Sequence, residues 1–242
     1  MKTKLFAGAL CVGLIFSSLL HASVTIDRTR LIYQQDDREA DVRLRNDGPK
    51  PVVVQSWLDN GDATQAPADI PVPFVLMPPI ARVEAAHGQV LRVVYTGEPL
   101  PHDKESVFWL NVLEIPPKEQ PAESRNVLQF AIRSRIKLFY RPKGLSGDAA
   151  DAPSKLTWKI VAQGDGYALE ASNPTAYHVS LNRVALQLDS RIIEAGDGMV
   201  SPGETQRYAL KGVQQAPAAG RVKYSFIDDW GAIRDNGAAE LH

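Results

Sequence analysis

The sequence has a single cysteine, Cys11, and almost no helical periodicity in its 242 residues. Because a lone cysteine cannot form an intrachain disulfide, the burial of apolar side chains must hold the chain together. An excess of positive charge is also missing, since 27 Lys and Arg stand against 28 Asp and Glu. This balance gives no reason to expect nucleic acid or a lipid surface as a partner.

Motifs for catalysis are missing as well. The sequence contains no G-x-S-x-G element, no phosphate-binding glycine loop and no calcium-loop spacing of acids. The histidines that follow residue 22 are not spaced as metal ligands, so we interpret them as surface residues and expect neither a metal nor another cofactor. They are His87, His102, His178 and His242. An enzyme, including a hydrolase on a β scaffold, is therefore not expected.

Residues 1–22 have the composition of a secretory signal peptide. Two early lysines precede an apolar run from Leu5 to Leu20, and small residues follow it. A membrane anchor needs about 20 continuous apolar residues, whereas Ser17 and Ser18 interrupt this run. We expect cleavage after Ala22, which removes the only cysteine and leaves an exported chain with a net charge of −3.

The remaining sequence consists of short β-branched and aromatic segments separated by Pro, Gly, Asn and Asp, a spacing typical of β-sandwiches. The predicted strands are Val24–Tyr33, Ala40–Asn46, Val52–Leu58, Phe74–Met77, Ile80–Ala85, Val90–Thr96, Ser106–Ile115, Val127–Tyr140, Leu156–Ala162, Tyr167–Ser172, Val179–Leu188, Ile192–Glu194, Gln206–Leu210 and Arg221–Ile227. Residues 143–154 are rich in Pro, Gly, Ala, Ser and Asp and are interpreted as a linker. The sequence thus predicts an all-β protein with two immunoglobulin-like sandwiches, at residues 23–142 and 155–242.

The longest predicted strand, Val127–Tyr140, alternates between an apolar and a polar face. Its apolar positions begin with Leu128, Phe130 and Ile132. About fourteen residues exceed the usual five or six, so part of the strand could overhang its domain and offer backbone groups to a partner. On alternation alone, however, an ordinary core strand is the better interpretation.

The run LPHDKESVFWLNVLEIP, from Leu100 to Pro116, resembles the signature of the PapD-like periplasmic chaperones for pilus assembly. Three further blocks agree with that family in order and spacing, namely Val24–Arg30, Ile136–Pro142 and Phe226–Gly231. The resemblance implies a boomerang of two immunoglobulin-like domains. It also implies a periplasmic chaperone that binds and folds pilus subunits by donor-strand complementation and delivers them to an outer-membrane usher.

The resemblance assigns roles to residues of the subunit-binding site. Arg30 and Lys137 would anchor the C-terminal carboxylate of the subunit in the cleft between the domains, where two cations can hold it by charge-assisted hydrogen bonds. The donor residues, which would fill successive pockets of the subunit's groove, are Leu128, Phe130 and Ile132.

Two further roles follow from the same resemblance. One is an interdomain salt-bridge network formed by Glu105, Arg141 and Asp229, and the other is engagement of the usher at Pro51. An unpaired donor strand can also pair with itself, so the free chaperone could form a self-capping homodimer. The alternative is a secreted immunoglobulin-like adhesion or carbohydrate-binding module, which would explain the two sandwiches but not the paired cations.

Overall fold

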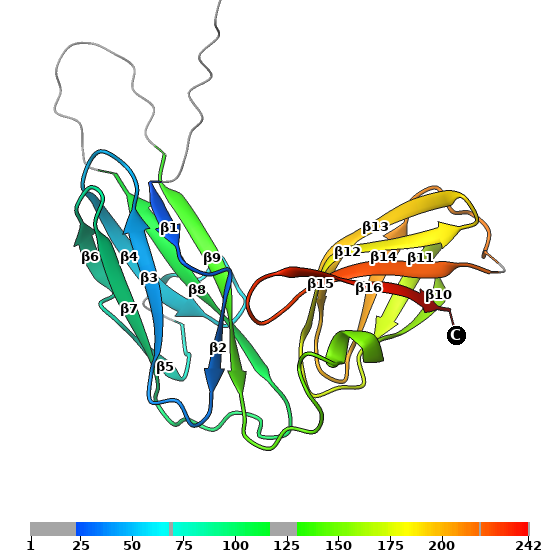
Figure 1. Ribbon diagram of the computed structural model, residues 1–242, viewed down its shortest axis with the longest axis horizontal. Helices are drawn as coiled ribbons and strands as arrows, with labels where there is room; N and C mark the ends of the chain where they lie inside the picture. Colours follow the sequence, from blue (N-terminus) through cyan, green and yellow to red (C-terminus); the bar gives the residue numbers. More distant parts are fainter. Residues whose placement is uncertain (1–22, 68–69, 117–129, 218, 242) are drawn as a thin grey trace, which may run out of the picture.

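A computed structural model describes residues 23–67, 70–116, 130–217 and 219–241. The predicted signal peptide and Leu128 lie outside the described residues. Within them the regular structure is β-strand apart from one short 3-10 turn, and no helix is long and apolar enough to cross a bilayer. Two β-sandwiches meet at an angle (Figure 1), which confirms the predicted all-β fold of two sandwiches in a boomerang.

The first sandwich packs a four-stranded sheet, in the order β1-β3-β7-β5, on a five-stranded sheet, in the order β2-β9-β8-β4-β6. Its strands are β1 (Val24–Ile26), β2 (Arg30–Gln34), β3 (Ala40–Asn46), β4 (Val52–Asp59), β5 (Phe74–Met77), β6 (Ile80–Val83), β7 (Gly88–Tyr95), β8 (Ser106–Ile115) and β9 (Ile132–Arg141). Alternate residues point inward, as a two-residue period requires. Val42 and Leu44 from one sheet and Leu110 and Leu138 from the other are almost fully buried in one core.

The predicted first strand, Val24–Tyr33, is instead two strands in different sheets. Asp27 interrupts it: its amide donates to the Arg43 carbonyl at 3.0 Å, and its carboxylate accepts the Arg43 amide at 3.1 Å. These bonds end the pairing of β1 with β3, and after residue 29 the chain continues as β2, which pairs in parallel with β9. The segment Val24–Tyr33 therefore contributes one strand to each sheet.

The prediction of one long strand from Val127 was wrong at its start. Strand β9 begins at Ile132 and runs to Arg141, while Phe130 precedes it with 53% of its surface exposed. Strand β8 ends at Ile115, and its Glu114 is the last residue that pairs with β9, opposite Ile132. A strand persists only where a neighbour accepts its backbone bonds, so apolar alternation alone overestimated its length.

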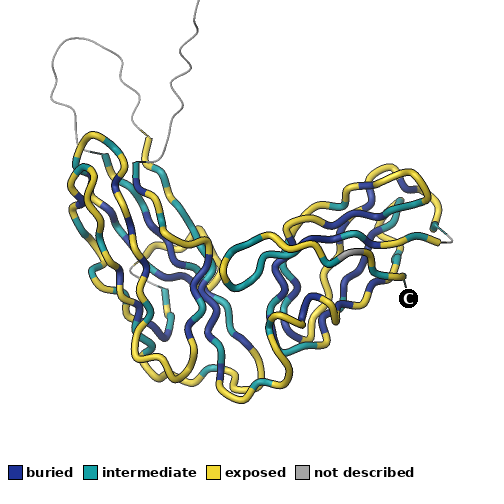
Figure 2. The backbone as a smooth tube through the Cα atoms, viewed as in Figure 1, coloured by how far each residue is buried: buried dark blue, intermediate teal, exposed yellow. Residues whose placement is uncertain are grey.

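The second sandwich packs a three-stranded sheet, in the order β10-β11-β14, on a four-stranded sheet, in the order β13-β12-β15-β16. Its strands are β10 (Thr157–Gln163), β11 (Gly166–Ser172), β12 (Val179–Leu188), β13 (Arg191–Val200), β14 (Thr205–Leu210), β15 (Arg221–Ile227) and β16 (Ile233–Glu240). Trp158 is the largest fully buried side chain and contacts the rings of Tyr208 and Tyr224. Buried residues line the inside of each sandwich separately (Figure 2), so the two domains have separate cores.

The sequence interpretation missed β16 because Ile233 is its only β-branched or aromatic residue, and the strand holds its place by pairing with β15. The predicted linker also differs from expectation at its end. Ala152 and Pro153 are buried in the turn η2 (Ala152–Lys155), and the Pro153 carbonyl accepts a hydrogen bond from the Tyr224 hydroxyl at 2.7 Å. This end of the segment packs on the second sandwich, while the domain boundary within residues 143–154 stays a prediction.

Two tryptophans of the second domain allow a test of this core. Trp158 is 1% exposed and Trp230 is 85% exposed. We expect Trp158→Ala to lower the free energy of unfolding of this domain by about 3–5 kcal/mol, because a buried ring leaves a cavity. Trp230→Ala should change it by less than about 0.5 kcal/mol. Urea denaturation followed by circular dichroism measures both, and equal effects would contradict the described core.

Candidate functional site

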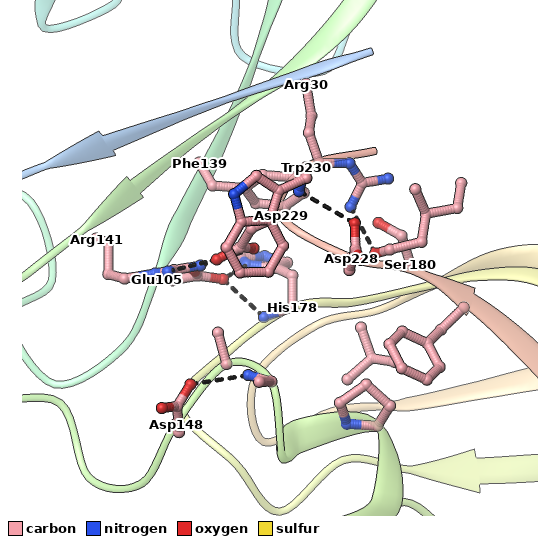
Figure 3. Close-up of a pocket in the computed structure, with 16 residues that line it drawn as sticks. Arg30, Glu105, Phe139, Arg141, Asp148, His178, Ser180, Asp228, Asp229 and Trp230 are labelled. Carbon is pink, nitrogen blue, oxygen red and sulfur yellow. Dashed lines mark hydrogen bonds and ion pairs between the residues drawn. The ribbon is translucent and has the colours of Figure 1, made fainter. Parts of the chain in front are cut away.

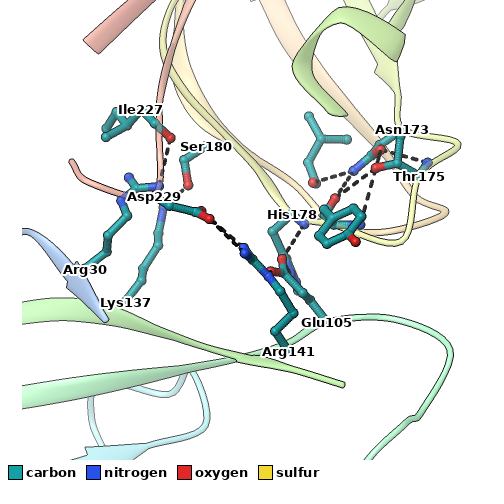
Figure 4. A network of polar contacts seen from close by, with 12 residues as sticks. Arg30, Glu105, Lys137, Arg141, Asn173, Thr175, His178, Ser180, Ile227 and Asp229 are labelled. Carbon is teal, nitrogen blue, oxygen red and sulfur yellow. Dashed lines mark hydrogen bonds and ion pairs between the residues drawn. The ribbon is translucent and has the colours of Figure 1, made fainter. Parts of the chain in front are cut away.

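The two sandwiches contact each other through polar groups, and the guanidinium of Arg141 lies at the centre of this junction (Figure 4). Its Nε donates to Glu105 of the same domain at 2.7 Å, and its terminal nitrogens bind Asp229 of the second domain at 2.8 and 3.1 Å. Arg141 comes from the end of β9, and Asp229 from the turn between β15 and β16. The structure thus brings together the three residues of the predicted salt-bridge network.

Glu105 connects the domains by further bonds. Its carboxylate accepts the His178 amide at 2.8 Å, and its own amide donates to the Ala176 carbonyl at 2.9 Å. Burial acts to raise the pKa of Glu105, but hydrogen bonds from His178 and the charge of Arg141 outweigh it and hold the pKa below its usual range. Glu105 is therefore ionised at neutral pH inside the junction.

His178 is a correction to the sequence interpretation, which placed all four histidines on the surface. Its side chain is 4% exposed, its Nδ1 lies 3.3 Å from Glu105 Oε2, and its ring packs near Phe139 of β9. No spacing motif marks this histidine in the sequence. It is recognised only once the two domains are placed against each other.

Arg30 and Lys137 lie side by side at the rim of the cleft. They are register partners on the parallel strands β2 and β9, and both side chains extend toward the second domain (Figure 4). Arg30 is 8% exposed and donates to the Ile227 carbonyl at 2.9 Å, and Lys137 Nζ lies 3.4 Å from the Ser180 hydroxyl. The structure thus places both predicted anchor residues together.

Acids act on these two cations only from beyond ion-pair distance, namely Asp229, Asp228 and Glu105 on Arg30, and Asp197 on Lys137. Among the described residues neither forms an ion pair, and the buried Nε of Arg30 has no hydrogen-bond acceptor. Burial lowers the pKa of Lys137, and the charge of Arg30 lowers it further. Burial also lowers the pKa of Arg30. Like charges in directly paired positions repel each other, so the pair is suited to bind an anion.

A cavity of about 90 Å³ lies beside this pair, between the domains (Figure 3). Arg30, Phe139 and Arg141 line it from the first domain, and His178, Ser180 and the Asp228–Trp230 turn line it from the second. The cavity therefore connects the salt-bridge network to Arg30, one of the two cations.

The start of β9 has an open edge. Strand β8 pairs with β9 along Ile132–Tyr140, whereas β2 pairs with it only from Lys137 to Arg141. Within the described residues, the other side of Ile132–Ile136 has no neighbouring strand. Its backbone groups are available to an added strand.

The odd-numbered side chains hold this open segment on the sheet. Arg135 forms an ion pair with the fully buried carboxylate of Asp59, and Arg133 donates two hydrogen bonds to the Asn111 side chain at 2.8 and 2.6 Å. Asn111 in turn donates to Asp59 at 2.7 Å. We call these four residues the arginine clamp. The sequence interpretation assigned them no function, because no motif links β4, β8 and β9.

The guanidinium groups of the clamp also stack on aromatic rings. Arg133 lies 4.9 Å from the Trp57 ring centre and Arg135 lies 4.7 Å from that of Trp109. Such cation–π contacts restrict both long side chains on the outer face of the sheet. The clamp thus fixes one face of Ile132–Ile136 while the strand's edge stays open.

Pro51, the predicted usher-binding residue, directly precedes β4. The next outward residue, Val53, is exposed and pairs with the exposed Ile115 of β8. Ile80 of β6 is also exposed. It pairs with Gln55, the next residue of β4 after Val53 on the outer face. Pro51 therefore borders an exposed apolar strip, formed by Val53, Ile80 and Ile115, on the same outer face as the clamp.

Comparison with known proteins gives consistent matches over both domains. Residues 23–146 match the family described as "Pili and flagellar-assembly chaperone, PapD N-terminal domain", and residues 151–238 match "Pili assembly chaperone PapD, C-terminal domain". The chain is 43% identical over 222 residues to the chaperone protein FimB/FhaD of Bordetella pertussis, covering 90% of this chain and 88% of that protein.

Solved structures are similar over the same range. The crystal structure of YadV, a probable fimbrial chaperone of Escherichia coli, has a TM-score of 0.78 and 38% identity, covering 91% of this chain and all of that one. A complex of the Salmonella enterica pilin SafA with its chaperone SafB has a TM-score of 0.73 and 27% identity, covering 90% of this chain and 95% of the matched chain.

The buried Glu105 predicts a pH-dependent stability difference. Its folded pKa lies below the usual 4.5, so its contribution to stability is complete above pH 4.5 and is lost as the pH falls through the lowered pKa. We expect Glu105→Gln to cost about 3 kcal/mol at pH 7 and progressively less on acidification. Urea denaturation of both proteins from pH 7 to 3 measures the difference. The exposed Glu98→Gln is the control, and a constant difference would contradict the prediction.

The arginine clamp predicts a local change in hydrogen exchange. Asp59→Ala removes the carboxylate that Arg135 and Asn111 share. We expect the amides of Ile132–Ile136 that bond to β8 to exchange roughly tenfold faster or more. Amide exchange read by mass spectrometry or NMR measures this, with the exposed Asp41→Ala as the control. Unchanged protection in this segment would show that β8 alone holds it.

Proposed function

Because this chain belongs to the PapD-like family of pilus-assembly chaperones and is a chaperone for pilus subunits, we propose that it completes the fold of each subunit with a donor strand. It works in the periplasm after its signal peptide is removed, and it passes the subunit to an outer-membrane usher. Family membership displaces the adhesion-module alternative. The role requires no catalytic step and no cofactor, since binding itself completes the fold of the subunit.

The pair of adjacent cations is the observation that carries this proposal. Arg30 and Lys137 stand next to each other in a partly buried cleft, and among the described residues neither forms an ion pair. Every subunit chain ends in a carboxylate, which can accept charge-assisted hydrogen bonds from both groups. The buried Nε of Arg30 would then find an acceptor as well.

The open edge of Ile132–Ile136 supports the donor-strand step. A subunit strand added there gains backbone hydrogen bonds whatever its own sequence is. The predicted donor residues lie at and before this edge: Ile132 opens β9, Phe130 is exposed just before it, and Leu128 is outside the described residues. Apolar side chains at these positions would each contribute about 1.5 to 3 kcal/mol when a subunit buries them, before ordering costs.

Two partner assignments complete the proposal. Pro51 and the apolar strip beside it are offered as the usher-binding surface, because an exposed apolar patch on an outer sheet face suits a protein partner. The open edge also allows one chaperone to pair with another, so we expect homodimers whose population rises with chaperone concentration and falls when subunit is added.

Co-expression with a pilus subunit tests the proposal. We expect wild type to form a stoichiometric complex, and we expect Lys137→Ala or Arg30→Ala to weaken it by about 2 kcal/mol or more, roughly thirtyfold in Kd. Phe130→Glu should weaken it too, because a charge replaces an apolar donor group. Affinity purification followed by titration measures these changes.

The control for charge is Lys211→Ala, since Lys211 is exposed in the second domain. A subunit whose C-terminus is amidated should bind the wild type as weakly as a free-carboxylate subunit binds Lys137→Ala. If amidation leaves the affinity unchanged, then the cations do not bind the carboxylate and the anchor is excluded.

A further inference from the structure

Trp230 is the most exposed large apolar side chain among the described residues, at 85%. It lies in the turn between β15 and β16, which points from the second domain toward the first (Figure 1). Single exposed apolar residues are common and need no explanation by themselves. The setting of this one differs, because the turn is rigid and lies against the proposed carboxylate site.

The turn is fixed by its own hydrogen bonds. The Asp228 carboxylate accepts the Trp230 amide at 3.1 Å, the Ala232 amide at 2.8 Å and Arg234 Nε at 2.9 Å. The Gly231 amide also donates to the Asp228 carbonyl at 2.9 Å. The backbone that carries the indole is therefore held in one conformation, so a partner would lose little of its binding energy in ordering it.

Three contacts then fix the turn relative to the first domain. Arg30 donates to the Ile227 carbonyl, and Arg141 binds Asp229. Gly231 has a φ of +85°, and a Cβ added there would collide with the Thr29 hydroxyl. Only glycine permits this close approach. Trp230 therefore keeps a fixed position relative to Arg30.

The indole and the guanidinium line the same cavity. Trp230 and Arg30 both border the space of about 90 Å³ between the domains, and Figure 3 shows both side chains at this cavity. Gly231 of this turn lies against Thr29, which directly precedes Arg30, so a chain whose terminal carboxylate reaches Arg30 would end close to the turn. Tryptophan is enriched among the residues that contribute most to protein interfaces, and its flat apolar ring suits an aromatic or apolar partner group.

We infer that Trp230 is a subunit-binding residue, which packs on an apolar or aromatic side chain in the final residues of the pilus subunit. The inference rests on the proposed anchoring of the subunit's carboxylate at Arg30 and Lys137. It adds a second recognition element, contributed by the second domain. The carboxylate is common to all subunits, whereas the side chain before it differs, so Trp230 gives the cleft a means to distinguish subunits.

The first experiment measures whether the subunit covers Trp230. Acrylamide quenching of tryptophan fluorescence is recorded for wild type and for Trp230→Phe, free and in complex with a pilus subunit, and the difference between the two proteins isolates Trp230. We expect strong quenching in the free chaperone and at least roughly a threefold decrease in the complex. Equal quenching in both states would overturn the inference.

The second experiment measures affinity. Trp230→Ala should weaken subunit binding roughly tenfold to hundredfold, and Trp230→Phe should restore most of the loss, because it keeps an aromatic face. The matched control is Ile192→Ala, an exposed apolar residue of the second domain near the β12–β13 turn. Replacing the apolar residue nearest the subunit's C-terminus by Gly should abolish the difference between wild type and Trp230→Ala.

The outcomes separate this inference from the proposed function. If Arg30→Ala loses the subunit while Trp230→Ala binds it like wild type, the function stands and the inference fails. The subunit could protect Trp230 from quenching while the effect of Trp230→Ala on affinity does not depend on the subunit's C-terminal residues. In that case another part of the subunit covers Trp230, and the inference is also overturned. If protection of Trp230 from quenching rises with chaperone concentration in the absence of subunit, a second copy of the chaperone covers Trp230, which overturns the inference. If wild type captures no subunit, the proposed function itself fails.

Discussion

The relative placement of the two sandwiches depends on one guanidinium, that of Arg141. Each domain has its own apolar core, whereas the junction is polar: Arg141 lies between Glu105 and Asp229, Glu105 also bonds to residues 176 and 178, and Arg30 and Lys137 add one bond each. Burial acts to lower the pKa of Arg141, but hydrogen bonds and charges from both carboxylates outweigh it and raise the pKa. Ion pairs of this kind require defined geometry and repay little of their desolvation cost, so we propose that this network fixes the angle between the domains more than it stabilises either fold.

The open edge of β9 follows from a second local constraint. Asp27 ends β1 and directs the chain from one sheet to the other, so that β2 covers only the later part of β9. An uncovered edge is normally a site of aggregation. Here the arginine clamp holds Ile132–Ile136 from the outer face through side chains, which leaves the edge free for backbone pairing.

The strands followed from the sequence where apolar residues alternate with charged ones, as in β3, or where β-branched and aromatic residues gather between turn residues, as in β4 and β8. The sequence did not predict the strands whose bounds depend only on backbone pairing with a neighbouring strand. Strand β16, which has a single β-branched residue, was missed, and β9 was predicted to start too early, since neither apolar alternation nor its absence shows where a neighbouring strand ends. The candidate site was located through motif blocks that place Arg30 beside Lys137, but His178 and Asp59 act through partners that no local pattern reveals.

The register of the two cations explains how the edge and the anchor can work together. Lys137 pairs with Arg30, the first residue of β2, so the cations mark the point at which the open edge ends. A strand that occupies the edge from Ile132 onward meets β2 there, and it must run parallel to β9 if its terminal carboxylate is to reach both groups. Because Ile132 and Lys137 face opposite sides of the sheet, the partner's side chains and its carboxylate do not compete for the same surface. Backbone and carboxylate are common to every subunit, so under the proposed function this arrangement would recognise a strand's end and direction without reading its sequence.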